Sequence, residues 1–427
     1  MKIKKFLLQT DNIDRDSFVW NMTGSMIMAF QSVIMLMILT RILGLYEAGL
    51  FTIAYANANL FLTIGKYGMR NFQVSDVTGQ FSFHEYRLSR AITTITMVFV
   101  ALAYVIYVGD KNQYTLEKSL IIMWMCIFKA VDAFEDVYHG LYQRRGRLDV
   151  AGKLLTLRLG LTLLVFGAGL FVLKDLLAAL MISTVVTVIL LVLFIKWSYM
   201  DFAEAKKEQT SFINVRHLLQ ICFPLFLGSF LAFYIGNAPK YSIDSVLNDE
   251  LQACYGFIAM PVFVIGLLNN FIFNPMIYKM SMMWNERKIK AFIRQLLIQA
   301  LIVAGITLAC ITGAYFLGVP VLSFLYNTDL AEYRSELLIL LLGGGFLALS
   351  GLLTTVITII RCQKRLMAGY VIVAALAYAL STRVVERYSI MGAAVLYLAL
   401  MAALCGIFVV LLIDGLVRKG KTDEKEN

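Results

Sequence analysis

The chain has 427 residues, of which 60% are hydrophobic and only 15% are charged, and its formal net charge is +10. A soluble protein contains roughly a quarter charged residues, so this composition excludes an ordinary soluble domain. Apolar runs recur along the whole sequence and approach the ~20 residues that cross the hydrocarbon of a bilayer. Strands of a membrane β-barrel would instead alternate in polarity over about ten residues. We therefore expect an all-α integral membrane protein.

Charged and turn-forming breaks divide the apolar runs into twelve predicted spans. The spans lie near residues 18–40, 46–68, 89–109, 118–142, 153–173, 176–197, 217–237, 253–279, 292–317, 337–361, 366–382 and 390–413. The division predicts an N-terminal six-helix lobe (1–200), a cytoplasmic linker (201–216), a C-terminal six-helix lobe (217–417) and a cytoplasmic tail (418–427).

The two predicted lobes show a faint internal repeat. Gly24-Ser25 in the first span corresponds to Gly228-Ser229 in the seventh, and Ile53-Ala54 in the second span corresponds to Ile258-Ala259 in the eighth. Because six spans is an even number, both halves would insert the same way up. Such repeats are related by an axis along the membrane normal, and the substrate site lies between them.

The positive charges predict the orientation of the chain. The termini and the loops that share their side hold 27 of the 38 lysines and arginines, whereas the opposite loops hold 8. Cytoplasmic loops of membrane proteins are enriched in lysine and arginine. We therefore expect both termini in the cytoplasm, in a multi-pass protein of the cell membrane. The positive net charge then reflects topology, and we expect no nucleic-acid partner.

The reactive residues do not form a recognisable catalytic or metal site. The six cysteines are scattered singly without a CxxC pair, and the chain has only three histidines. A disulfide framework, a zinc site and a redox motif are disfavoured by this spacing, and no nucleophile constellation is present. We expect no catalytic residue, no metal and no cofactor.

Charged residues interrupt the fourth span in the stretch KAVDAFEDVYH, residues 129–139. At 100° per residue, Lys129, Asp132, Asp136 and His139 share one face of a helix, and Glu135 widens that face. A charge near the bilayer centre costs at least ~2.5–3.5 kcal/mol, so the stripe should face water or partners. We expect Lys129 to line a cavity. For the residues that follow, a cytoplasmic helical extension is the open alternative.

Other charges lie in or beside apolar runs. Arg158 follows the start of the fifth span by about one turn, where it could either snorkel to the interface or line a cavity. Lys66, late in the second span, is expected to snorkel. Lys240 follows a Gly-Asn-Ala-Pro break at the outer end of the seventh span. Lys129, Arg158 and Lys240 are the candidate cavity cations.

Three blocks of the sequence are similar to a known family. These are SVIMLMILTRILGLYEAGLFTIAYANANLFLTIGKYGMRNFQVSD (32–76), GLYQRRGRLDVAGK (140–153) and APKYSIDSVLNDELQACYGFIAMP (238–261). The first resembles the start of polysaccharide flippases, and the other two fit the O-antigen and capsule repeat-unit flippases. These proteins form part of the multidrug/oligosaccharidyl-lipid/polysaccharide exporter superfamily. The resemblance extends over most of the chain in the number and layout of the spans.

The resemblance implies a MATE-like fold of two six-helix lobes around a central cavity that opens alternately to either face. It also implies a function, the transfer of polyprenyl-diphosphate-linked oligosaccharide from the cytoplasmic to the outer leaflet for cell-surface polysaccharide or lipopolysaccharide biosynthesis. Cavity cations would hold the diphosphate, since unpaired charge is costly to bury in hydrocarbon. Asp132 and Asp136 would either couple an ion or balance Lys129, and we favour charge balance.

The expected partners are the lipid-linked oligosaccharide, membrane lipids, and a glycan polymerase or glycosyltransferases of the same pathway, with the chain itself a monomer. The nearest alternative is a cation-coupled multidrug or small-molecule antiporter of the same superfamily, which would need deep acids with few compensating cations. A membrane enzyme that polymerises or ligates glycans would need a large outer loop, but the longest expected here is roughly 318–336. An inert scaffold would leave the lysine of the fourth span unexplained.

Overall fold

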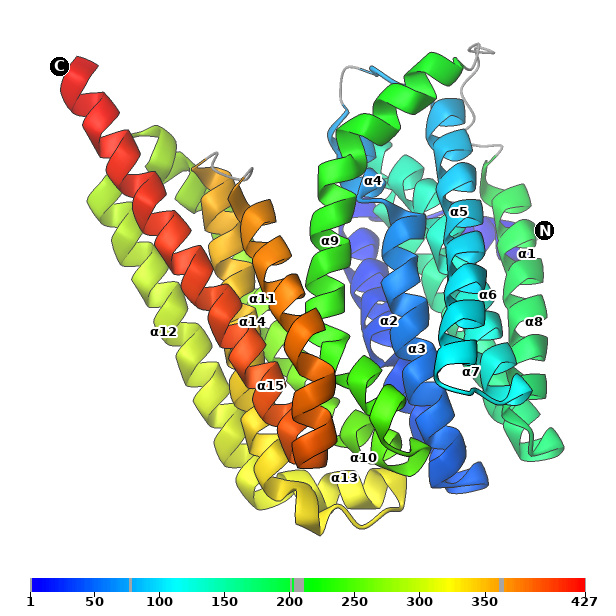
Figure 1. Cartoon of the computed structure of the whole chain (residues 1–427). Helices are drawn as coiled ribbons and strands as arrows, with labels where there is room; N and C mark the ends of the chain where they lie inside the picture. Colours follow the sequence, from blue (N-terminus) through cyan, green and yellow to red (C-terminus); the bar gives the residue numbers. More distant parts are fainter. Residues whose placement is uncertain (1, 77–78, 200–201, 203–210, 361–364, 427) are drawn as a thin grey trace. The chain divides into compact units, whose positions relative to one another are not determined.

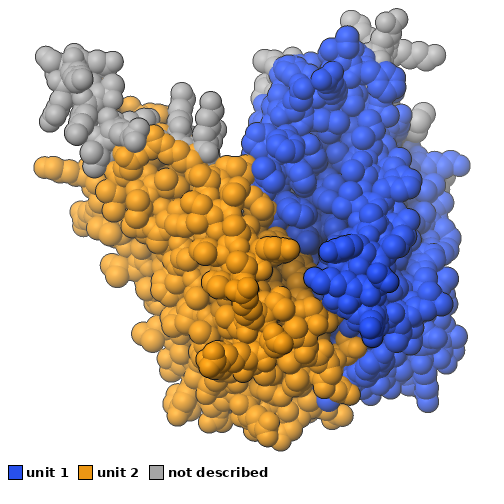
Figure 2. All heavy atoms as spheres, in the orientation of Figure 1, with its two compact units in different colours: residues 1–230 blue, residues 231–427 orange. Residues whose placement is uncertain are grey.

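The computed structural model describes residues 2–76, 79–199, 202, 211–360 and 365–426 (Figure 1). Within these ranges the regular structure consists of helices, without strands. The helices divide into two compact units, Met1–Phe230 (unit 1) and Leu231–Asn427 (unit 2), which Figure 2 colours separately. Each unit is described by itself below.

Unit 1 contains the candidate site. Its helices are α1 (Lys2–Leu8), α2 (Ile13–Leu43), α3 (Leu45–Lys66), α4 (Met69–Ser75), α5 (Phe83–Lys111), α6 (Leu116–Arg144), α7 (Leu148–Leu173), α8 (Leu176–Ser198) and the first part of α9 (Phe212–Val246). Within the unit α2 packs on α7, and α3 packs on both α5 and α6.

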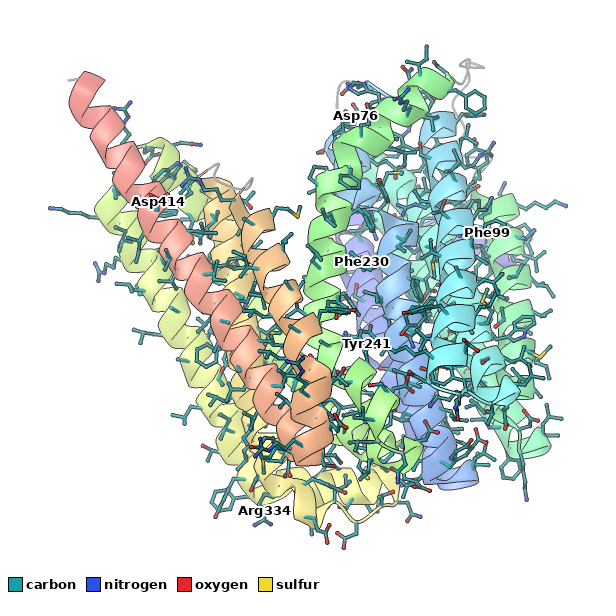
Figure 3. The ribbon with its side chains drawn as sticks, viewed as in Figure 1. Asp76, Phe99, Phe230, Tyr241, Arg334 and Asp414 are labelled. Carbon is teal, nitrogen blue, oxygen red and sulfur yellow. The ribbon has the colours of Figure 1, made fainter. Side chains whose placement is uncertain are left out.

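Unit 2 begins within α9 and ends with the longest helical segment of the chain. Its helices are α10 (Asp249–Ala259), α11 (Val262–Asn285), α12 (Ile289–Gly313), a π-helical turn (Ala314–Gly318), α13 (Val319–Tyr326), a 3₁₀ turn (Ala331–Tyr333), α14 (Arg334–Ile359) and α15 (Leu366–Glu426). Helix α14 packs against α11, α12 and α15. Arg334 and Asp414 are labelled on α14 and α15 in Figure 3.

The described chain has ten helical segments long and apolar enough to cross a membrane. Helix α6 is not among them because of its charged stripe. The last of the ten, Leu366–Leu416, is interrupted at Ser389, whose φ of 52° is not helical, so α15 contains two spans. With α6 and the second part of α15, the ten segments become twelve. The predicted all-α membrane fold with about twelve spans is confirmed.

The division into units falls within α9 and not at the predicted linker, where residues 201 and 203–210 lie outside the described part of the chain. The first half of α9 belongs to unit 1 and packs against the other helices of that unit. Leu218 and Cys222 are buried in the same hydrophobic cluster as Phe83 of α5. The rings of Tyr67 and Phe226 stack with centroids 4.7 Å apart. The predicted tail is part of α15 up to Glu426, and residue 427 is not described.

Local chemistry determines where the helices around the site begin. Helix α5 starts with a capping box, in which the side chains of Ser82 and Glu85 each accept a backbone N–H. The Thr115 hydroxyl caps α6 by accepting from Lys118 N at 3.1 Å. Such caps satisfy backbone donors that a helix cannot satisfy internally.

Two glycines allow the helices around the site to approach closely. A Cβ at Gly152 of α7 would lie 2.5 Å from backbone atoms of Trp20 and Asn21 on α2. A Cβ at Gly65 of α3 would lie 2.7 Å from the Cβ of Ala133 on α6. Interiors are packed too tightly to accept such overlaps, so these crossings require glycine.

Candidate functional site

The charged stripe of α6 is buried inside unit 1. Relative exposure is 2% for Lys129, 5% for Asp132, 4% for Glu135, 7% for Asp136 and 5% for His139. The midpoint of α6 lies near residue 130. At about 1.5 Å per residue, a hydrocarbon layer of about 30 Å centred there would contain the whole stripe. Charges at this depth need partners, and the neighbouring helices supply them.

Lys129 is held by α2 and by its own helix. Its Nζ donates to Gln31 Oε1 at 2.6 Å and to Asp132 Oδ2 at 3.1 Å. The same nitrogen lies 4.7 Å from the centre of the Tyr55 ring on α3, which is within cation–π range. In this structure the ammonium group is therefore enclosed within unit 1. Whether a substrate reaches it stays a prediction.

Arg158 joins α7 to α6 and α8, and it is fully buried. Its guanidinium donates to Asp132 Oδ1 at 2.7 Å and to Glu135 Oε2 at 2.6 Å. A further N–H donates to Thr187 Oγ1 at 3.0 Å. The planar fork of arginine suits this simultaneous binding of several acceptors. Arg158 thus lies within the bundle and does not snorkel to the interface.

Asp136 is paired with two arginines and not with Lys129. Arg90 of α5, fully buried, donates to Asp136 Oδ2 at 2.9 Å and to the carbonyl oxygen of Gly65 at 2.8 Å. Arg70 of α4, partly exposed, lies 3.4 Å from Asp136 Oδ1 and donates to Gln143 Oε1 at 2.9 Å. This end of the stripe therefore ties α4 and α5 to α6.

We call these seven side chains the buried charge network: Arg70, Arg90, Lys129, Asp132, Glu135, Asp136 and Arg158. It has four cations and three carboxylates, and each carboxylate has a cation within 3.1 Å. Three of the cations are buried and match the three carboxylates in number, so the excess positive charge belongs to Arg70, which is partly exposed. Such pairs lose much of their Coulomb gain to desolvation, so they specify an arrangement more than they stabilise it.

Several polar atoms around the network have no hydrogen-bond partner among the described residues. They are Nε2 of Gln31, both side-chain polar atoms of Asn57, Nε of Arg90, Nε2 of His139 and Nε of Arg158. His139 Nε2 lies 3.6 Å from Glu135 Oε1, too far for a good hydrogen bond. Buried polar groups are normally satisfied, so these atoms could still bind water or substrate oxygens.

The structure brings together some of the predicted site residues. Lys129 and Arg158 share Asp132, whereas Lys240 lies in the part of α9 that belongs to unit 2, where no described carboxylate pairs with it. The helical extension considered for Glu135, Asp136 and His139 would be solvated, but these side chains are buried.

The sequence pattern did not single out three residues of the site, namely Arg70, Arg90 and Gln31. Arg90 is the eighth residue of α5 and is fully buried. A signal was present, because Arg90 directly precedes the apolar run AITTITMVFVALAYVIYVG.

The fold is that of MOP-superfamily transporters. An inward-facing multidrug resistance MATE family transporter superposes with a TM-score of 0.67 at 13% identity, covering 93% of this chain and 96% of the other. The lipid II flippase MurJ in an inward closed conformation gives a TM-score of 0.67 at 13% identity, covering 92% and 90%. A MOP transporter from Pyrococcus furiosus gives 0.59 at 13% identity, covering 98% of both chains.

At these identities the similarity establishes the fold and not the substrate. No family model and no curated protein matches the chain. The chain is thus a multi-pass membrane protein with the two-lobed MOP transporter fold, as the sequence predicted. Solved structures with this fold include both multidrug transporters and a lipid II flippase, so the substrate has to be argued from the residues of the site.

Proposed function

We propose that the chain is a flippase, not an enzyme. It translocates polyprenyl-diphosphate-linked oligosaccharide units from the cytoplasmic to the outer leaflet by alternating access, for cell-surface polysaccharide biosynthesis. The fold supports membrane transport, and one neighbour in structure is itself named a flippase. A polar headgroup of this size cannot cross hydrocarbon unassisted, because burying unpaired charge costs many kcal/mol.

The observation that favours an anionic substrate is the charge balance of the buried charge network. Its carboxylates are all paired with cations: Asp132 with Lys129 and Arg158, Glu135 with Arg158, and Asp136 with Arg90. A cationic drug would have to displace one of these cations to bind a carboxylate. The one cation beyond this balance, the partly exposed Arg70, would instead attract a diphosphate, since basic side chains are the usual ligands of phosphate groups.

Within this proposal the predicted site residues have different roles. Lys129 and Lys240 are the cations that the diphosphate meets as the transporter changes conformation. Arg158 holds Asp132 and Glu135, and thereby positions Asp132 against Lys129. Asp132 and Asp136 balance charge. The Nε2 of Gln31, which has no partner within the described residues, is a further donor beside Lys129.

The test measures lipid-linked oligosaccharides in cells with and without the protein, using a membrane-impermeant sugar-modifying reagent to report surface access. We expect the depleted cells to accumulate oligosaccharide that is shielded from the reagent. Wild-type protein should restore access, Lys129→Ala should not, and Lys129→Arg should restore it in part because it keeps the charge.

The matched control is Arg216→Gln, which removes one positive charge from an exposed position of α9. This variant should restore access like the wild type. If the oligosaccharide reaches the surface normally in depleted cells, the glycan role is wrong. A cation-coupled multidrug antiporter then becomes the leading function, and export of cationic dyes should fall in the same cells.

A further inference from the structure

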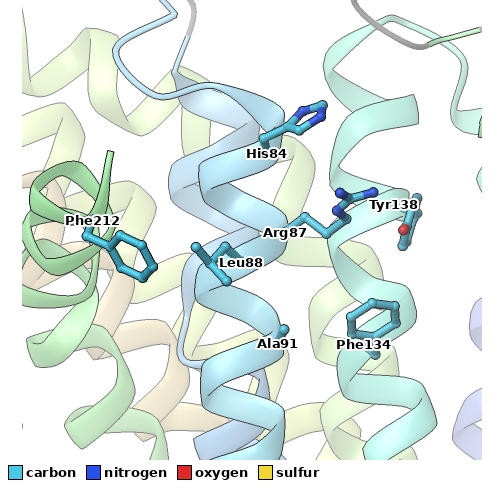
Figure 4. Close-up of a pocket in the computed structure, with 7 residues that line it drawn as sticks. All are labelled: His84, Arg87, Leu88, Ala91, Phe134, Tyr138 and Phe212. Carbon is cyan, nitrogen blue, oxygen red and sulfur yellow. The ribbon is translucent and has the colours of Figure 1, made fainter. Parts of the chain in front are cut away.

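A pocket lies on unit 1 outside the buried charge network. It has a volume of about 390 Å³ and lies between α5 and α6, with Phe212 at the start of α9 beside it (Figure 4). Its polar lining comes from His84 and Arg87. Its apolar lining includes Leu88, Ala91 and Phe134. The pocket thus has a basic part and an apolar part, the division expected of a site for an amphipathic ligand.

Within the described part of the chain, no acid neutralises the basic part of the pocket. Arg87 points from α5 toward Tyr138 on α6 (Figure 4). Glu85 is the acid closest in sequence, and its carboxylate instead accepts from Asn214 Nδ2 at 2.7 Å and from Ser211 N at 3.2 Å. No described lining residue is acidic. Because the guanidinium has five N–H donors, Arg87 keeps donors for an anion.

The side of the pocket formed by Tyr138 is aromatic. The ring of Tyr138 lies 5.5 Å from that of Phe83, 5.9 Å from that of Phe134 and 5.9 Å from that of Tyr199, measured between centroids. Aromatic residues with one polar tip are typical of the level at which lipid headgroups meet hydrocarbon. This aromatic lining is therefore the kind expected of a pocket at the membrane interface.

The length of α5 also places the pocket at the level of the membrane interface. It has 29 residues, and the hydrocarbon layer accommodates about 20, so a central placement leaves four or five residues outside at each end. Arg87, the fifth residue of the helix, then lies at the boundary. Beyond Leu88 and Ala91 the helix exposes Ile95, Phe99 and Ile106, at 56%, 66% and 65% (Phe99 is labelled in Figure 3). The apolar part of the pocket thus continues into a lipid-facing stripe.

We propose that this pocket is a binding site for one anionic glycerophospholipid of the leaflet that the charge bias predicts to be cytoplasmic. Arg87 and His84 bind the headgroup phosphate. An acyl chain lies along Leu88 and Ala91 and continues over Ile95. A basic pair beside an apolar lining suits one phosphate headgroup with its acyl chain, which favours a resident membrane lipid over the transported substrate.

The position of the pocket suggests what the lipid does. Phe134 and Tyr138 belong to α6, where they lie next to Glu135 and His139 on the adjoining face. A lipid that bridges α5 and α6 would therefore stabilise the helix pair that holds the Arg90–Asp136 interaction. This role does not depend on which substrate the protein transports.

The test is native mass spectrometry of the full-length protein, purified in detergent and titrated with phosphatidylglycerol. We expect one lipid to bind more tightly than the rest. Arg87→Gln should weaken that binding about tenfold, as expected for the loss of a charge-assisted hydrogen bond. Ala91→Trp should also weaken it, because the ring fills the apolar part of the pocket. Arg216→Gln, an exposed charge on α9, should bind like the wild type.

Three outcomes would overturn the proposal. One is equal binding by the wild type and Arg87→Gln, with circular dichroism showing both to be folded. Another is displacement of phosphatidylglycerol by millimolar inorganic phosphate, which would make the site a phosphate site. The third is preferential binding of a polyprenyl diphosphate that Arg87→Gln abolishes, which would assign the pocket to the substrate. A rise in thermal stability on adding phosphatidylglycerol to the wild type, absent in Arg87→Gln, would support it.

Discussion

Replacement of Arg158 by methionine tests the energetics of the buried charge network. The variant replaces the aliphatic stem of arginine by an apolar chain of similar volume and removes the donors to Asp132, Glu135 and Thr187. Asp132 keeps Lys129 as a partner at 3.1 Å, whereas Glu135 is left with only His139, at 3.6 Å. Removing one partner of a buried pair costs about 3–5 kcal/mol, because the other charge stays buried. We expect a loss of this size in the free energy of unfolding.

The assay is equilibrium unfolding in detergent, followed by tryptophan fluorescence. The deciding comparison is the double variant Arg158→Met with Glu135→Leu, which removes the stranded carboxylate as well. If the cost arises from the unpaired charge, the double variant will be more stable than Arg158→Met alone. Interaction energies between such neighbours are about 0.5–3 kcal/mol. A double variant whose loss equals the sum of the two single losses would refute the reasoning.

Three further predictions concern other contacts of unit 1. Lys129→Met should cost less than Arg158→Met, about 1.5–3 kcal/mol, because Asp132 keeps Arg158; an equal or larger loss in unfolding free energy would contradict this. Gly152→Ala should destabilise the protein by about 1–3 kcal/mol, since its Cβ would lie 2.5 Å from the backbone of α2. The control is Gly160→Ala on the same helix, whose Cβ would meet nothing within 4 Å, and it should be neutral or stabilising in the same assay. Asp76→Asn should destabilise the protein at neutral pH. Burial by itself would raise the pKa of Asp76, but the hydrogen bonds from Gln80, Phe81 and Tyr86 outweigh the effect of burial and hold that pKa below 3.8. Because the pKa is lowered in the folded state, the contribution is present above about pH 3.9 and is lost as the pH falls further, so the stabilities of variant and wild type should converge in acid.

Asp76, labelled in Figure 3, also shows how the connection between α4 and α5 is held. Its carboxylate accepts from the backbone N–H groups of Gln80 at 2.8 Å and Phe81 at 3.2 Å, and from the Tyr86 hydroxyl at 3.0 Å. Tyr86 is the fourth residue of α5, one turn before Arg90. Gln80, Phe81 and the first turn of α5 are therefore held by one carboxylate.

The sequence by itself was sufficient for the membrane fold, the number of spans and the polar face of α6. Hydrocarbon thickness determines how long an apolar run must be, and the 3.6-residue period determines which residues share a face. The contact between Lys129 and Asp132 could be read in the same way, because these residues are three apart on one helix.

Only the tertiary structure decided what the polar face contacts. Arg158 and Glu135 are 23 residues apart, Arg90 and Asp136 are 46 apart, and Lys129 and Gln31 are 98 apart. The helical period determines the direction of each side chain around its own axis, but not which helix lies opposite. That choice depends on close packing, such as the approach of α3 to α6 at Gly65, which many local patterns would permit. A lysine expected to line a cavity could therefore be located in sequence, whereas its partners on α2 and α3 could be found only in the folded chain.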